Sequence, residues 1–252
     1  MIAANVNRAA LYQACQIFLS DSPETITALE IGVLRGDNAE DLLEILSPER
    51  LYLLDTWSAE TLCSALYSRR AHRPWLRSPS SLSNYFGGNI AEQRTFDKLY
   101  DQVKQRFLKR GGVEVVKGSS KNWGSLLPRH KINYVYLDGS HQYEDVLDDL
   151  IAINDNAAAQ AIVQLNDCFV SHQSHAQNIG VIEAVSRFIK LFQWSPVCLA
   201  TGSNDVVISR GFHDMKERFC QILDSSNIRY ISVPSASLGS VYLNEHGSLF
   251  FD

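Results

Sequence analysis

Short apolar runs alternate along the chain with longer amphipathic segments. The apolar runs cover residues 27–31, 51–54, 113–116, 134–137 and 161–165. Each has only four or five positions, and hydrophobic side chains dominate it without a strict alternation with polar ones. This pattern is typical of strands that are buried on both faces of a parallel sheet.

The segments between these runs repeat their apolar positions with the period of a helix. We predict helices over residues 7–19, 38–46, 92–108, 143–154 and 180–192. Strands that alternate with helices of this length indicate an α/β fold, in which a mostly parallel central sheet carries helices on both faces. Ligands bind such sheets at the carboxyl ends of the strands, so we expect the functional residues in the loops that follow them.

Two segments depart from this alternation, within what we interpret as a single domain over residues 1–252. The first, at about residues 58–90, is an insertion rich in cationic and aromatic side chains, which suit either a solvated loop or a lid over an anionic or aromatic substrate. The second is a C-terminal extension from about residue 212, whose short apolar runs after Ile228 predict added strands. These strands would cover a sheet edge or pair across a homodimer. The side chains that mark the insertion are Arg69, Arg70, His72, Arg73, Trp75, Arg77, Tyr85 and Phe86.

Composition narrows the class of protein further. The chain has 252 residues, of which 45% are hydrophobic, and a net charge of −5, which argues against a nucleic-acid partner. Its five cysteines include no Cys-x-x-Cys pair for zinc or redox chemistry. No apolar stretch approaches the roughly 18 residues of a membrane span, and the first residues do not read as a secretory leader. We therefore expect a cytoplasmic protein without a membrane partner.

The loop after the first predicted strand contains two glycines, four positions apart. Gly32 and Gly36 stand between strand and helix, where they let a small polar or anionic ligand approach the backbone and the helix N-terminus. A mere tight turn would explain the glycines equally well. Asp55 ends the next strand, however, and an acid at that place can accept hydrogen bonds from both hydroxyls of a ribose. Together the two loops predict a nucleoside site.

A second group of polar residues follows two later strands. Asp138 ends one strand, and the pair Asn166 and Asp167 follows the next, so that three oxygen donors are expected to converge. This donor set suits Mg²⁺. His141 stands three residues after Asp138, where it can remove a proton from a substrate hydroxyl. The alternative is that Asp138 contacts only the cofactor while the Asn-Asp pair caps its loop.

Five stretches of the sequence resemble class I S-adenosylmethionine-dependent methyltransferases. They read ALEIGVLRGDNAEDL, LYLLDTW, VEVVKGSS, INYVYLDGSHQYEDVLDDL and AIVQLNDCF, and the resemblance covers about residues 28–210. The run YLDGSHQYEDVLDDL is similar to the branch related to macrocin O-methyltransferase. The resemblance implies a Rossmann-like methyltransferase fold, S-adenosylmethionine as cofactor and a small-molecule substrate.

The resemblance also implies roles for individual residues. Asp55 would bind the ribose, and Trp57 and Ser119 would contact the adenine, although a core position is an equal alternative for the indole. His141 and Asp138 would act in catalysis, and Asp138, Asn166 and Asp167 would hold the metal. Asn166 stands where the related pattern has an acid, which predicts weak metal binding. The residues assigned to the cofactor are Glu30, Gly32, Gly36, Asn38, Asp55, Trp57, Ser119 and Asp138.

The predicted activity is methyl transfer to a hydroxyl oxygen of a small molecule, with possible help from Mg²⁺. Two alternatives stay open: a methyltransferase-like module that binds the cofactor without catalysis, and a related hydroxylase-like enzyme. His172 and His175 are spare candidates for base or metal ligand. We expect a solvated helix face to carry the acids Glu144, Asp145, Asp148 and Asp149.

Overall fold

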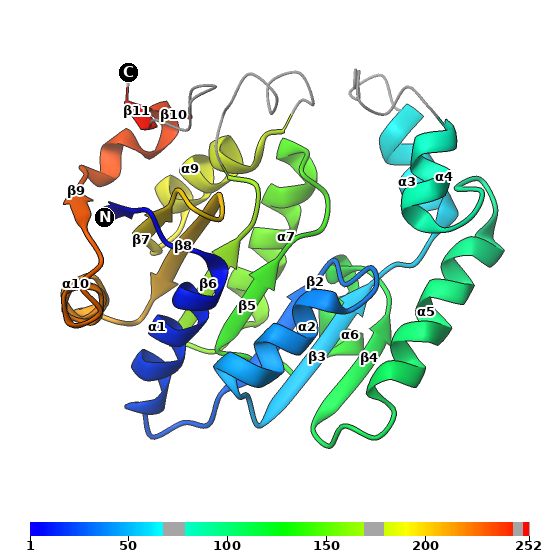
Figure 1. Cartoon of the computed structure of the whole chain (residues 1–252), viewed down its shortest axis with the longest axis horizontal. Coiled ribbons are helices and arrows are strands. Elements are labelled where there is room, and N and C mark those ends of the chain that lie inside the picture. The colour runs from blue at the N-terminus through cyan, green and yellow to red at the C-terminus, as the bar shows by residue number, and fades with distance from the viewer. Residues whose placement is uncertain (68–78, 169–178, 244–248, 252) are drawn as a thin grey trace.

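A sheet of nine described strands forms the centre of the protein (Figure 1). The structure, a computed structural model, describes residues 1–67, 79–168, 179–243 and 249–251. The strands of the sheet are β1 (Ile2–Ala4), β2 (Thr27–Ile31), β3 (Arg50–Asp55), β4 (Val113–Lys117), β5 (Tyr134–Leu137), β6 (Ala161–Leu165), β7 (Ser195–Ala200), β8 (Asp205–Arg210) and β9 (Tyr230–Ser232). A separate antiparallel pair is formed by β10 (Val241–Leu243) and β11 (Leu249–Phe251).

The strand order is β4-β3-β2-β5-β6-β8-β7-β1-β9. The five strands from β4 to β6 run parallel, and β8 runs antiparallel to both β6 and β7. The chain proceeds from β2 outward to one side through β3 and β4, then returns to the other side of β2 as β5. Strands β2 and β5 therefore flank the point where the winding reverses, which is where open α/β sheets bind their ligands.

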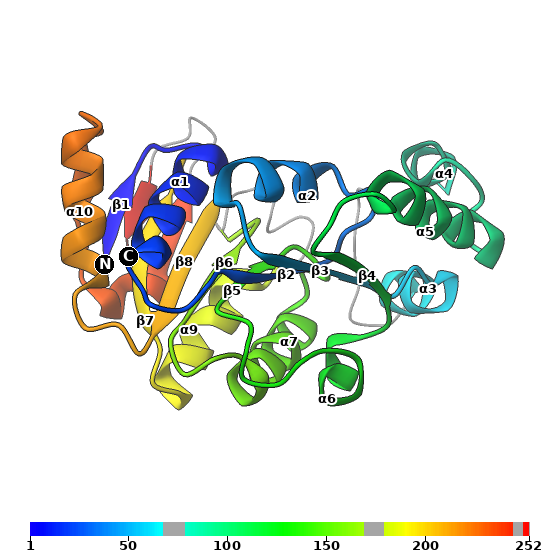
Figure 2. The ribbon, with the colours of Figure 1, turned by 90° about the horizontal axis from the view of Figure 1, so that it is seen from below.

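Helices cover both faces of the sheet, as Figure 2 shows with the sheet seen nearly edge-on. One face carries α1, α2, α5 and α10, and the other carries α6, α7 and α9. Beyond β4, the helices α3 and α4 stand beside α5 (Figure 1). The helices are α1 (Arg8–Ser20), α2 (Asp37–Asp41), α3 (Ala59–Tyr67), α4 (Pro79–Phe86), α5 (Gln93–Phe107), α6 (Trp123–Leu126), α7 (Tyr143–Asn156), α9 (Val181–Leu191) and α10 (Met215–Ser225).

Each helical layer buries an apolar stripe against its face of the sheet. On the first face, Leu11 and Phe18 of α1 and Phe107 of α5 belong to one buried cluster. On the second face, Leu150 of α7 and Phe188 of α9 belong to another. Burial of side chains of this size stabilises each layer by roughly 1.5–3 kcal/mol per residue, so the two clusters fix the strand ends in place.

The α/β fold with a mostly parallel sheet is confirmed, and the five predicted strands lie where the apolar runs placed them. The helix predicted over residues 38–46 is α2 followed by a π-helical turn at Leu42–Leu46. Strands also form in the tail after Ile228, as predicted. The sequence patterns did not indicate β1, β7 or β8, which extend the sheet beyond β6.

Candidate active site at the strand ends

The glycine loop after β2 lies against the loop after β5. Gly32 has a φ of +89°, and a Cβ atom at this position would lie 2.1 Å from the carbonyl oxygen of Asp138. Gly36 has a φ of +76°, and its Cβ would lie 2.7 Å from the ring of Phe107. Only glycine fits both the backbone angle and the space at these two positions. The close approach brings the cofactor loop predicted from Glu30 to Asn38 next to Asp138.

Glu30 lies beneath this loop with 1% of its surface exposed. Its Oε1 accepts a 3.1 Å hydrogen bond from Asn38, whose Oδ1 accepts a 2.6 Å hydrogen bond from Tyr12. Its Oε2 is buried and has no hydrogen-bond partner among the described residues. Burial raises the pKa of Glu30 to about 8, and the Asn38 bond opposes the rise. The unpartnered oxygen is suited to accept a hydrogen bond from a ligand cation or hydroxyl.

Asp55 connects the end of β3 to the glycine loop. Its Oδ2 accepts a 2.9 Å hydrogen bond from the N–H of Leu34, and its Oδ1 accepts one of 2.9 Å from the N–H of Trp57. Burial raises the pKa of this carboxyl, and backbone donors, Trp57 foremost, oppose the rise. The acid is therefore fixed beside the loop where the ribose was predicted.

Trp57 supports the same loop from below. Its indole N–H donates a 3.0 Å hydrogen bond to the carbonyl of Leu34, and its ring centre lies 5.0 Å from that of Tyr100. Only 1% of the residue is exposed. These contacts agree with the alternative of a core aromatic, and the adenine contact of Trp57 stays a prediction.

The loop after β4 contains Ser119 and contacts a partly buried acid of α7, Asp149, which the sequence analysis placed on a solvated face. Ser119 is half-buried and caps a 3₁₀ turn by accepting a 3.3 Å hydrogen bond from Lys121. The neighbouring Ser120 donates its hydroxyl to Asp149 of α7. Burial raises the pKa of Asp149 to about 6. The prediction that Asp149 lies on a solvated face is therefore wrong, because it faces the β4 loop, whereas Asp148 is exposed and pairs with Lys121 at 2.8 Å.

The second predicted group converges after β5 and β6. His141 Nε2 lies 3.2 Å from Oδ1 of Asp138 and 3.6 Å from Oδ2 of Asp167. Asn166 donates its amide to the same Oδ1 of Asp138 over 3.1 Å. Between a quarter and a half of each of the side chains of Asp138, His141 and Asp167 is exposed, so a substrate can reach them. An imidazole held by a carboxylate is oriented for proton transfer.

A cation from the far end of the chain also reaches this group. Arg8, in the first turn of α1, donates a 2.8 Å hydrogen bond to Oδ1 of Asn166 and lies 3.5 Å from Oδ2 of Asp205. Asp205 is the first residue of β8, which is antiparallel and so begins at the edge where β6 ends. Sequence reasoning missed both residues, because no motif marks them.

The donor set of this site does not fit a magnesium ion. The carbonyl oxygen of Asn166 is taken by Arg8, and its N–H₂ group faces Asp138. Mg²⁺ requires oxygen ligands and is repelled by a neighbouring guanidinium. In the part of the chain that the structure describes, no three His, Cys, Asp or Glu side chains are arranged to hold a metal ion. The predicted metal role of Asp138, Asn166 and Asp167 finds no support in this arrangement.

Some candidates lie outside the described residues. These are His172 and His175, and the cationic and aromatic side chains Arg69, Arg70, His72, Arg73, Trp75 and Arg77. Of the same insertion, Tyr85 is described and is 56% exposed, with the Arg35 guanidinium 5.4 Å from its ring centre.

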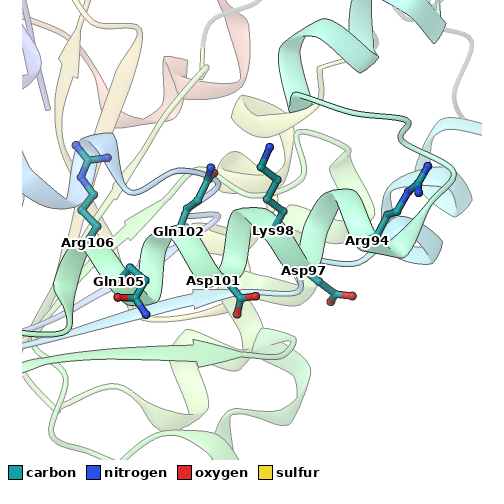
Figure 3. A pocket seen from close by; sticks show the side chains of 7 residues that line it. All are labelled: Arg94, Asp97, Lys98, Asp101, Gln102, Gln105 and Arg106. Atoms are coloured by element: carbon teal, nitrogen blue, oxygen red, sulfur yellow. The ribbon is translucent and has the colours of Figure 1, made fainter.

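A shallow hollow on the outer side of α5 is a different kind of surface (Figure 3). Two of its charged groups are paired with exposed neighbours: Asp97 lies 2.8 Å from Lys117, and Arg106 lies 2.6 Å from Asp37. It holds none of the buried unpartnered polar atoms found among the described residues. We interpret it as a solvated helix face. Its lining residues are Arg94, Asp97, Lys98, Asp101, Gln102, Gln105 and Arg106.

Comparisons with known proteins agree with the fold. The O-methyltransferase NovP superposes on 81% of this chain and 79% of its own, with a TM-score of 0.50 and 14% identity. A Staphylococcus aureus protein described as a caffeoyl-CoA O-methyltransferase superposes on 82% of this chain and 85% of its own, with a TM-score of 0.51 and 9% identity. At such low identity these likenesses establish the fold alone. A search of curated proteins finds no match.

The family model of a methyltransferase domain matches residues 29–168, which is more than half of the chain. The class that the fold and this match define is that of the S-adenosylmethionine-dependent methyltransferases. The chain belongs to this methyltransferase-domain family, and S-adenosylmethionine is its cofactor. The site fits that molecule, because the buried, unpartnered oxygen of Glu30 is what an α-ammonium group needs, and Gly32 keeps the loop free of a side chain.

Proposed function

We propose that the protein methylates a hydroxyl oxygen of a small molecule and belongs to the branch related to macrocin O-methyltransferase. The observation that carries this proposal is the Asp138–His141 pair. Nε2 of His141 lies 3.2 Å from Oδ1 of Asp138. The pair lies beside the Gly32 loop, where the backbones after β2 and β5 meet. A hydroxyl is a poor nucleophile until its proton is removed, and a general base beside the cofactor loop can remove it.

The residues divide the work as follows. S-adenosylmethionine, when bound, supplies a methyl group that is open to nucleophilic attack. Glu30 and Asp55 bind and orient the cofactor on one side of the loop. His141 accepts the hydroxyl proton, and Asp138 orients the imidazole and stabilises its protonated form. The reaction needs a short approach in line with the bond that breaks, so much of the rate depends on positioning.

The role of the insertion belongs to the same proposal. The insertion at about residues 58–90 would close over the substrate, and its return to the main fold is fixed at Gln93. Gln93 accepts a 3.0 Å hydrogen bond from the N–H of Ala59 and donates one of 2.8 Å to the carbonyl of Trp57. A closing lid that is anchored to the strand ends at its base would exclude water from the reaction.

None of the described helices is long and apolar enough to cross a membrane.

The experiment combines cofactor binding with methyl transfer. Calorimetry with S-adenosylhomocysteine tests the cofactor site, with adenosine triphosphate and NAD as controls. Labelled S-adenosylmethionine is then incubated with a panel of small polyhydroxylated and phenolic compounds, and the position of the label in any product is read by NMR. Label on oxygen that is lost with His141→Ala supports the proposal. Label on nitrogen or carbon contradicts the O-methylation. Binding without transfer to any compound would favour the non-catalytic module.

A further inference from the structure

Arg8 is a charged residue of the strand-end site to which the proposed mechanism gives no task. Its guanidinium donates to Oδ1 of Asn166 over 2.8 Å, and its Nε lies 3.5 Å from Oδ2 of Asp205. The guanidinium carbon lies 5.2 Å from the centre of the Tyr136 ring. Residues at the ends of β5, β6 and β8 thus surround one cation that comes from α1.

A buried network fixes this cation in place. Asp205 has no exposed surface, and its Oδ2 accepts a 2.5 Å hydrogen bond from Gln164. Gln164 in turn accepts one of 2.7 Å from the hydroxyl of Tyr134. Burial raises the pKa of Asp205 to about 6, and Arg8 opposes the rise, so the carboxylate is charged at neutral pH. A buried carboxylate without a cation is costly, which ties Arg8 to this position.

The position of Arg8 determines the orientation of the side-chain amide of Asn166. Because the guanidinium takes the carbonyl oxygen of Asn166, the amide N–H₂ group points to Oδ1 of Asp138. That same oxygen lies 3.2 Å from His141 Nε2. A divalent ion between Asp138 and Asn166 would meet amide hydrogens where it needs a lone pair, with a positive charge behind them.

We propose that Arg8 is the resident cation of this site: it holds the place that a divalent metal ion would need at Asp138, Asn166 and Asp167, and it positions Asp138 and His141 through Asn166. The positioning of His141 rests on the proposed function, whereas the exclusion of a metal ion does not. Arg8 is a positioning residue in this view, because it acts on the reacting groups only through Asn166.

The test measures metal binding to the whole chain and requires no substrate. Mn²⁺ is titrated into the protein, and the free ion is followed by electron paramagnetic resonance. We expect no site tighter than about 1 mM in the wild type. The single variant Asn166→Asp should still exclude the ion, because Arg8 remains. A variant that adds Arg8→Met and Asp205→Asn to Asn166→Asp should bind Mn²⁺ at least about tenfold more tightly than the wild type. Removing both members of the ion pair avoids an uncompensated buried charge.

Two controls separate this inference from the proposed function. Adding Asp167→Asn to the combined variant should remove the new Mn²⁺ site, and S-adenosylhomocysteine binding should stay within about threefold of the wild type in a variant that folds. Mn²⁺ binding to the wild type tighter than about 1 mM that is lost in a folded Asp167→Asn single variant would overturn the inference. A folded combined variant that gains no Mn²⁺ site would also overturn it. Neither result bears on whether the enzyme methylates oxygen.

Discussion

Nδ2 of Asn38 donates a hydrogen bond to Oε1 of Glu30 over 3.1 Å, while Oε2 of the same carboxyl is buried and has no partner in the described part of the chain. Asn38 lies in α2, directly after the glycine loop, so one side of the carboxyl is satisfied by the fold and the other is left for a ligand. This half-satisfied carboxyl makes the protonation of Glu30 sensitive to the cofactor.

We predict that cofactor binding releases a proton near pH 7. With a pKa of about 8, Glu30 is largely neutral in the free protein at that pH, and an ammonium group beside Oε2 favours its ionised form. Calorimetry of S-adenosylhomocysteine binding in two buffers of different ionisation enthalpy measures the release. Glu30→Gln should release none at pH 7. A wild type that binds the ligand at pH 7 without any proton release would contradict the assignment of Glu30.

The same carboxyl should make stability fall as pH rises. Its pKa is about 8 in the folded chain and near 4.5 when unfolded, so the folded state binds the extra proton between these values. The free energy of unfolding therefore decreases from about pH 4.5 to pH 8, by at most about 5 kcal/mol from this group. Urea unfolding of the wild type and Glu30→Gln should show the difference most cleanly between pH 6 and 8. Parallel curves for the two proteins would refute it.

Gly32 should tolerate alanine far less well than another glycine with a similar backbone angle. Gly32→Ala places a Cβ 2.1 Å from the Asp138 carbonyl oxygen, whereas at Gly87, with a φ of +75°, no atom of the described residues lies within 4 Å of the added one. Gly87→Ala should lower the free energy of unfolding by about 1–2 kcal/mol from backbone strain alone. Gly32→Ala should cost more than that and weaken S-adenosylhomocysteine binding. Equal losses of stability would show that the two loops do not meet as described.

Asp55 is predicted to bind the ribose through a charged acceptor. Asp55→Ala should weaken S-adenosylhomocysteine binding by at least roughly 10-fold, because each hydrogen bond to a charged group contributes about 1.5–3 kcal/mol. The variant also loses the bonds to Leu34 and Trp57, so its thermal unfolding is measured alongside. Asp97→Ala, an exposed acid paired with Lys117, is the matched control and should bind normally. Unchanged affinity in a folded Asp55→Ala protein would exclude the ribose contact.

Methyl transfer should depend on His141 and should survive the removal of metal ions. Once a methyl acceptor is found, His141→Ala should lower kcat by roughly 10²–10⁴ with little change in cofactor affinity. Excess chelator should leave the wild-type rate unchanged, because Arg8 provides the positive charge. Inhibition by chelator that Mg²⁺ reverses would restore the metal role of Asp138, Asn166 and Asp167.

The parallel half of the sheet could be predicted from the sequence because its strands are buried on both faces. Residues 134–137 and 161–165 are short hydrophobic runs with turn signals on either side, and their places in the structure match. Strand β1 has three residues and β8 follows β7 after a short turn, so neither stands out as one unit of a strand-helix repeat. Local patterns reveal strands that alternate with helices better than strands that extend a sheet.

The residues of the candidate site also fall into those that the sequence predicts and those that it does not. Gly32, Asp55, Asp138 and His141 follow strands directly, so their convergence follows from the topology. Arg8 is 158 positions from Asn166 and lies in a helix that the sequence presents as ordinary, so its contact depends on how α1 crosses the sheet. The prediction for Asp149 was wrong for a similar reason, since its contact with Ser120 of the β4 loop joins residues 29 positions apart in the sequence.

The antiparallel strand β8 has a practical consequence for anyone who trims the gene to the recognisable domain. A fragment of residues 29–168 would end just after β6 and would lack both β8 and α1. The edge of β6 would then offer unpaired backbone N–H and C=O groups, flanked by apolar side chains, to other molecules, which is a template for aggregation. We expect such a fragment to accumulate as inclusion bodies, so the smallest useful expression unit is the chain from β1 at least through β8.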